Sequence, residues 1–333
     1  MHNNILRCAS RFGACLVAAA MLAAVPFTAN AQAWPSRPIR WVAPFVAGGG
    51  FDLLTSAVAA QMSASLGQPI VVENRSGASG IVGTELVVRS APDGYSLVAA
   101  DNGTWVYNPL LYKKMPFDVE KDLVPVGLLG GAPLFLTVSE GLGAKTLKEF
   151  IDMVKANPGK VSYGSSGTGS IQHMSVELFK KSGNLDILHI PYKGAALGVL
   201  DLAAGRIGMM ILVRSTAAPH VATGKLRILA TTDGARSPML PEVPTVSEAG
   251  LPGFEVPRWY GGVAAPGAVP REVLARLNQE VRRALTDPKV ITRIQELGYV
   301  IAPAVDPREI EEMNRKERAT WAPLVKSLNV SLD

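Results

Sequence analysis

Two glycine-rich turns are the segments of this sequence best suited to bind an anion. The first runs from Pro44 to Asp52 and the second from Tyr163 to Ser170. Each turn is expected to join the end of a strand to the start of a helix, where unpaired backbone N–H groups and the helix dipole favour negative charge. The pair therefore indicates two halves of the chain that face one carboxylate or phosphate, although either turn alone also fits an ordinary strand-to-helix connection.

The second turn also contains residue types that a hydrolase uses. Ser165 or Ser166 would act as a nucleophile with His173 as its base, but the sequence contains no Gly-x-Ser-x-Gly elbow. Serines are expected in an anion-binding turn as well. A secreted serine hydrolase is therefore only an alternative, and we expect no enzyme activity and no catalytic residues.

Cofactor and metal sites find little support. Gly48–Gly50 imitates the start of a dinucleotide-binding fingerprint, but Leu53 occupies the position of the third glycine. His173, His189 and His220 lack the spacing of metal ligands. We expect neither a cofactor nor a metal.

Residues 1–31 have the pattern of a cleaved export signal. Arg7 and Arg11 precede an apolar stretch from about Ala14 to Phe27, and small residues follow it. The apolar stretch is too short to span a bilayer comfortably. We predict cleavage near Ala31 and a location outside the cytoplasm.

Composition narrows the possible chemistry further. Cys8 and Cys15 are the two cysteines of the chain, and both fall within residues 1–31. The remaining chain would therefore have no disulfide, cysteine nucleophile or thiolate metal site. Loss of residues 1–31 removes two arginines, so the formal charge falls from +5 to +3. Basic residues are scattered without a run of five, which gives no support for a nucleic-acid partner.

Strand and helix patterns alternate along the chain, which is typical of parallel α/β sheets. A second unit of this kind is expected to start near Gly130. The expected strands cover 39–44, 69–73, 95–100, 134–138, 161–164, 187–191, 207–213, 226–231 and 259–264. The expected helices cover 51–66, 80–89, 147–157, 171–182, a segment ending at 204, 270–286 and 288–297.

The expected sheets bring two loops to the same rim and divide the chain into two lobes. Ligands of parallel sheets bind outside the carboxyl ends of strands, so Phe45–Gly50 and Asn102–Thr104 are expected on one rim. The chain would cross twice between the two α/β lobes. Two such crossings form a hinge on which the lobes close.

Short motifs follow one another in a fixed order through the chain. They are Trp34–Ile39, Pro44–Asp52, Gly67–Arg75, Ala91–Tyr95, Pro191–Gly194, Gly224–Arg227 and Pro241–Val246. In sequence and spacing this series resembles the Bug family, the substrate-binding proteins of tripartite tricarboxylate transporters. The resemblance covers essentially the whole chain after residue 31.

The resemblance implies an α/β fold with two doubly wound lobes joined by a hinge, like a type II periplasmic binding protein. Lobe 1 would comprise residues 32–129 and 256–333, and lobe 2 residues 130–255. The expected function is a periplasmic receptor that holds a small organic carboxylate between its lobes and delivers it to membrane permease subunits. The alternative is a module that presents the carboxylate to a sensor kinase ectodomain. A monomer without a nucleic-acid partner is expected.

The resemblance also implies which residues bind the ligand. Backbone N–H groups of the first turn would clamp one carboxylate, while hydroxyl groups come from the opposite lobe. Asp52 as a helix cap, and His173 and Tyr192 as core residues, stay open as alternatives. The expected ligand-binding set is Phe45, Ala47, Gly48, Gly49, Asp52, Asn102, Thr104, Ser165, Ser166, Thr168, Gly169, Ser170, His173, Tyr192, Arg214 and Trp259.

One departure from the family pattern bears on the ligand. Where the family often has Phe-Asp-Asn after two methionines, this chain has Ile211–Val213 followed by Arg214. The missing acidic residue disfavours an amino acid, and Arg214 would pair with a second carboxylate if it pointed into the cleft rather than into solvent. An aromatic acid or a dicarboxylate is therefore the preferred ligand class.

Overall fold

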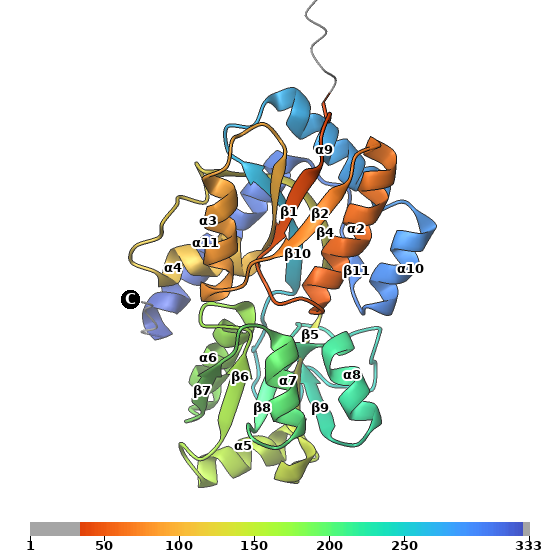
Figure 1. Cartoon of the computed structure of the whole chain (residues 1–333). Coiled ribbons are helices and arrows are strands. Elements are labelled where there is room, and N and C mark those ends of the chain that lie inside the picture. The colour runs from red at the N-terminus through yellow and green to blue at the C-terminus, as the bar shows by residue number, and fades with distance from the viewer. Residues whose placement is uncertain (1–33, 329–333) are drawn as a thin grey trace, which may run out of the picture. The chain divides into compact units, whose positions relative to one another are not determined.

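A six-stranded and a five-stranded β-sheet organise the chain (Figure 1). The computed structural model describes residues 34–328 of the 333, and residues from Arg37 onward belong to one compact unit. The expected export signal and its cleavage site lie outside the described residues. No helix among residues 34–328 is long and apolar enough to cross a membrane.

The first sheet contains strands from both ends of the chain. Its order is β11-β4-β10-β3-β1-β2, with β1 parallel to β2 and β3 and with β10 antiparallel to both β3 and β4. Its strands are β1 (Ile39–Ala43), β2 (Ile70–Asn74), β3 (Ser96–Asp101), β4 (Leu123–Ala132), β10 (Trp259–Pro266) and β11 (Val300–Ile301).

The second sheet is built from the middle of the chain. Its order is β7-β6-β8-β5-β9, and β5 runs antiparallel to β8 and β9. Its strands are β5 (Leu134–Ser139), β6 (Ser162–Ser165), β7 (Leu188–Pro191), β8 (Met209–Val213) and β9 (Leu226–Thr231). The predicted α/β class with two lobes is confirmed by these two sheets.

Helices cover the sheets, as Figure 1 shows for α2 beside β1 and β2 and for α7 and α8 beside β8 and β9. The α-helices are α2 (Gly50–Leu66), α3 (Ile81–Val88), α4 (Asn108–Leu111), α5 (Leu147–Ala156), α6 (Ile171–Gly183), α7 (Ala195–Ala203), α8 (Arg214–Ala222), α9 (Arg271–Ala284), α10 (Pro288–Glu296) and α11 (Pro307–Leu328). The shorter helical turns are η1 (Ala78–Gly80), η2 (Gly103–Tyr107, a π-helix) and η3 (Glu140–Leu142).

Local sequence explains where α2 and α6 lie. Strand β1 is almost entirely apolar and buried, as expected for a strand covered on both faces. Helix α2 ends at Gly67, whose left-handed φ of 67° suits glycine. Ser170 caps α6 by accepting a hydrogen bond from the His173 N–H.

Besides the short elements α4 and β11 and the helical turns, the sequence analysis did not predict β4, α8 and α11. Strand β4 contains Pro125 and several glycines, which are uncommon in strand interiors. These glycines are needed because Cβ atoms on Gly130 and Gly131 would lie 2.9 Å from backbone oxygens of β11 and β10. Helices α8 and α11 each contain an internal proline, which hides the helical pattern.

We predict that truncating the core face of α2 destabilises the protein strongly. Leu54 is fully buried, so Leu54→Ala should lower the free energy of unfolding by about 2–5 kcal/mol through lost burial and a cavity. Val71→Ala on β2 is the control, because Val71 is 54% exposed and should change stability by about 0.5 kcal/mol at most. Urea unfolding of both variants measures the difference, and equal losses would contradict this packing.

Candidate functional site

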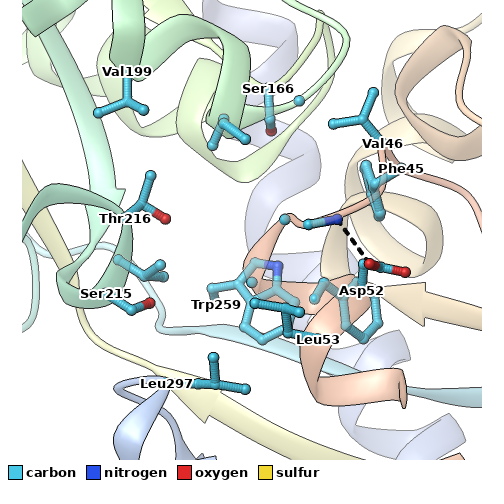
Figure 2. A pocket seen from close by; sticks show the side chains of 18 of the residues that line it. Phe45, Val46, Asp52, Leu53, Ser166, Val199, Ser215, Thr216, Trp259 and Leu297 are labelled. Atoms are coloured by element: carbon cyan, nitrogen blue, oxygen red, sulfur yellow. Dashed lines mark hydrogen bonds between the residues drawn. The ribbon is translucent and has the colours of Figure 1, made fainter. Parts of the chain in front are cut away.

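A pocket of about 350 Å³ lies where loops from the two sheets meet. Its size falls within the usual range for small-molecule sites. In Figure 2, Val199, Ser215 and Thr216 line one side, and Phe45 and Asp52 lie on the opposite side. The pocket therefore draws on both lobes.

The first glycine-rich turn forms one end of this pocket. Phe45, Gly48, Gly49 and Asp52 line it, whereas Ala47 is not among the lining residues. Gly48 adopts a φ of 78°, which favours glycine. The turn thus follows the sequence-based expectation in position, with one exception.

Hydrogen bonds within the turn decide which amide groups are free. The Gly48 N–H donates to Asp52 Oδ2 at 2.8 Å (dashed in Figure 2), and the Gly49 N–H faces the Val46 carbonyl at 3.4 Å. Gly50 and Phe51 begin α2, so their N–H groups have no partner within the helix. The donors available to a ligand are therefore shifted from the predicted Gly48 and Gly49 to the next two residues.

Asp52 braces the turn. Besides the Gly48 N–H, its carboxylate accepts a hydrogen bond from Asn74 Nδ2 at 2.8 Å, and the same Asn74 amide donates to the Phe45 carbonyl at 3.1 Å. These contacts tie the loop before α2 to its first turn, but they do not cap the helix, whose N-cap residue is Gly49. Direct contact with an anionic ligand is disfavoured, since a carboxylate repels an anion.

The second glycine-rich turn contributes little to the pocket directly. Only Ser166 lines it, and its Oγ donates to Gln172 Oε1 at 2.7 Å. Ser165 is fully buried, with Oγ 2.7 Å from His189 Nε2. Ser170 is occupied as the cap of α6. Most residues of this turn therefore support the pocket wall without lining the pocket.

Three aromatic rings stack behind the second turn. The His173 and His189 ring centroids lie 4.2 Å apart, and those of Tyr163 and His189 lie 4.7 Å apart. His173 Nδ1 accepts a hydrogen bond from the Gly169 N–H at 3.2 Å. Burial, with smaller contributions from neighbouring His189 and Lys180, lowers the pKa of His173 to about 3. His173 and Gly169 thus fix the backbone of the turn and do not reach the pocket lining.

A smaller cavity of about 200 Å³ adjoins the first turn. Thr168 and Tyr192 line it together with Phe45 and Ser166. The Tyr192 hydroxyl donates to Asp201 Oδ2 at 2.8 Å. Thr168 and Tyr192 therefore lie beside the large pocket rather than in its lining.

The loop after β3 differs from the expectation. Asn102 and Thr104 are buried within or next to the π-helical turn, and neither lines the pocket. Asp101 lines it instead, with its carboxylate accepting hydrogen bonds from Trp259 Nε1 at 3.2 Å and from the Thr104 N–H at 3.1 Å. Burial raises the pKa of Asp101. Trp259 lines the pocket as expected.

The segment after β8 also differs. Arg214 is the first residue of α8 and is not among the pocket-lining residues, whereas Val213, Ser215 and Thr216 are. The predicted contact of Arg214 with a second carboxylate therefore has no support in the pocket geometry. Sequence reasoning missed α8 because its internal Pro219 concealed the helix.

Three helix N-termini meet at this pocket. The N-cap residues of α2, α7 and α8 are Gly49, Gly194 and Val213, and none of them supplies a side-chain cap. Each of these residues lines the pocket. Their exposed N–H groups and aligned dipoles favour an anion at the centre. The sequence analysis expected the helices that correspond to α2 and α7, but it recognised only the start of α2 as an anion-binding position.

The geometry does not provide a hydrolase site. Ser165 is paired with His189 rather than with His173, and the serine is fully buried outside the pocket lining. Within residues 34–328 no cluster of three or more histidine, cysteine or acidic side chains is arranged to hold a metal.

Comparisons with known proteins agree with a binding site of this kind. Residues 54–330 match the model of the tripartite tricarboxylate transporter family receptor. The chain is 34% identical to the BugT protein of Bordetella pertussis over 304 residues, which is 91% of this chain and 93% of BugT.

Two solved structures show the same fold with ligands. An R. palustris protein solved with adipate is 32% identical, with a TM-score of 0.85 over 90% of this chain and 99% of that one. MatC of Rhodopseudomonas palustris, solved with malate, is 31% identical, with a TM-score of 0.83 over 88% of this chain and all of MatC.

The stacked histidines predict a pH-dependent stability. Burial also lowers the pKa of His189, to about 4, while the unfolded chain titrates near 6.5. The unfolded state therefore binds more protons between these values, so stability falls as the pH drops from about 7 towards 4. At about pH 5 we expect a loss on the order of 1–2 kcal/mol per histidine.

Urea unfolding of wild type and His189→Gln across this pH range tests the prediction. Glutamine retains a hydrogen-bonding group near Ser165 but does not titrate, so the variant should lose less stability between about pH 7 and pH 5. The same slope in both proteins would contradict it.

Proposed function

The chain belongs to the tripartite tricarboxylate transporter receptor family of periplasmic solute-binding proteins, and on this premise we propose that it delivers a small organic carboxylate to a membrane permease. The resemblance to the Bug family is thereby confirmed. Because the family consists of receptors, the alternative of a secreted hydrolase loses its support.

The observation that carries the proposal is the meeting of three uncapped helix N-termini in one pocket. Unpaired N–H groups at these positions are suited to accept carboxylate oxygens. Charge-assisted hydrogen bonds of this kind contribute about 1.5–3 kcal/mol each, so a few of them support micromolar affinity after the cost of ordering.

The walls between the helix ends favour a ligand with an apolar body. Phe51 and Trp259 form one wall, with ring centroids 4.9 Å apart, while Val199 and Val213 stand in the other lobe. The two acidic residues of the lining, Asp52 and Asp101, already accept hydrogen bonds from protein donors. We therefore favour a dicarboxylate or an aromatic acid over an amino acid, as the sequence also suggested.

Closure of two lobes would complete the site. We propose lobe 1 as residues 32–129 and 256–333, and lobe 2 as residues 130–255. Contacts already bridge them, since the Ser79 hydroxyl donates to the Thr168 carbonyl. Gly194 also approaches Val46 so closely that an added Cβ would lie 2.9 Å from Val46 Cγ2.

We expect adipate or malate to raise the melting temperature of the protein that lacks residues 1–31. A ligand at 100 times its dissociation constant adds roughly 2.7 kcal/mol, which corresponds to a shift of roughly 5 °C or more. Benzoate extends the panel to aromatic acids, and aspartate serves as the amino-acid comparison. Recovery of the ligand unchanged supports a receptor. A shift by aspartate alone would refute the preferred class, and consumption of the ligand would refute the receptor.

We predict that a side chain at Gly194 weakens binding by hindering the approach of the lobes. Gly194→Val should reduce affinity for the best acid of that panel at least about tenfold, because the new side chain meets Val46. Gly224→Val is the matched control: Gly224 also has a positive φ in lobe 2, but a Cβ there meets nothing within 4 Å. Isothermal titration calorimetry compares the two. Equal affinity losses would show that backbone strain, not closure, is responsible.

A further inference from the structure

Tyr299 is a pocket-lining residue that sequence reasoning did not single out. It follows Gly298, whose left-handed φ of 78° turns the chain after α10, and it precedes β11. Pairing of Val300 with Gly131 of β4 anchors this turn to the first sheet. The Tyr299 side chain thereby reaches a pocket whose lining, apart from the neighbouring Leu297, lies far away in the sequence.

The ring of Tyr299 is held firmly. It packs against Trp259 with centroids 5.2 Å apart, and the residue is only 3% exposed. A phenylalanine would make the same apolar contacts. The hydroxyl group therefore adds nothing to this packing that a plain ring would lack.

The hydroxyl group lies at the start of α2. A Cβ atom on Gly50 would overlap the Tyr299 hydroxyl oxygen, so glycine is required there for close approach. Gly50 is the first residue of α2, and its N–H group has no partner within the helix. A phenolic O–H and the free amide end of a helix thus converge on one point of the pocket.

The Tyr299 hydroxyl has no hydrogen-bond partner within residues 34–328. Burial raises its pKa well above the usual value, so the group keeps its proton and acts as a donor. The hydroxyl oxygen is not among the side-chain atoms that are both fully buried and without a partner, so it is accessible from the pocket. A donor that opens on a pocket and lacks a protein acceptor is suited to an acceptor brought by the ligand.

We propose that Tyr299 is a ligand-binding residue whose hydroxyl donates a hydrogen bond to the carboxylate held at the N-terminus of α2. The inference rests on the proposed function, because it assigns a donor within the same site. It adds a side-chain donor from the segment between α10 and β11 to the backbone donors of the first turn. It also makes the pair of Gly50 and Tyr299 a determinant of which acids fit.

The first test measures the affinity of Tyr299→Phe for adipate and malate by calorimetry. We expect a loss of about ten- to a hundredfold for the acid that wild type binds best, with the melting temperature of the ligand-free protein within about 2 °C of wild type. Tyr95→Phe is the matched control, since Tyr95 precedes β3 at the end opposite Asp101. It should bind like wild type.

The outcomes distinguish a failure of the proposed Tyr299 role from a failure of the proposed receptor function. Wild-type affinity in Tyr299→Phe would overturn the role of the hydroxyl while leaving the receptor function intact. If wild type itself binds neither adipate nor malate nor any other carboxylate of the panel, the proposed function fails and the role of Tyr299 fails with it. An affinity loss in Tyr95→Phe as large as that in Tyr299→Phe would also overturn it.

A second test examines the position of the hydroxyl without any ligand. Gly50→Ala should lower the melting temperature more in wild type than in Tyr299→Phe, because removal of the oxygen makes room for the new methyl group. Equal decreases in both backgrounds would show that the hydroxyl does not lie against Gly50 and would overturn the proposal.

Discussion

Unpaired backbone N–H groups at three helix starts are the constraint on which this site depends. The N-cap residues of helices α2, α7 and α8 are Gly49, Gly194 and Val213, none of which has a side-chain oxygen to cap the helix. Helices α6 and α5, by contrast, are capped by the side chains of Ser170 and Thr146. At the three helix starts that line the pocket, a ligand oxygen is able to take the place of the missing cap.

The charge preference of the pocket depends on the hydrogen bonds of its two acidic side chains. Asp52 and Asp101 both line it, which at first disfavours an anionic ligand. The Asp52 carboxylate, however, accepts hydrogen bonds from the Gly48 N–H and Asn74. The Asp101 carboxylate accepts them from Trp259 and Thr104. These donors offset the negative charge of the two carboxylates, and they also fix the first turn and the loop after β3. The free helix ends are therefore the groups left to set the preference for charge.

Sequence patterns predicted the parts of the fold that depend on local signals. The turn from β1 into α2 was recognised because an apolar strand, glycines and a helix follow one another within a few residues. The path of the chain after β3 and β8 was not predicted from the sequence. A π-helical turn buries Asn102 and Thr104 after β3, and helix α8 begins at Arg214 directly after β8. Tyr299 reaches the pocket only through the pairing of β11 with β4, a contact between distant segments that no local pattern encodes.

The division of donors between the lobes links ligand binding to closure. Helix α2 begins in the part of the chain that forms the first sheet, whereas α7 and α8 begin beside the second. A carboxylate bound at α2 alone leaves the dipoles of α7 and α8 facing water, so part of the available binding energy appears only when the two lobes approach. A ligand shifts such an equilibrium only by its differential affinity for the two states. An acid with oxygens at both ends and an apolar centre meets donors and walls of both lobes, and it therefore favours the closed form more than a short monocarboxylate does.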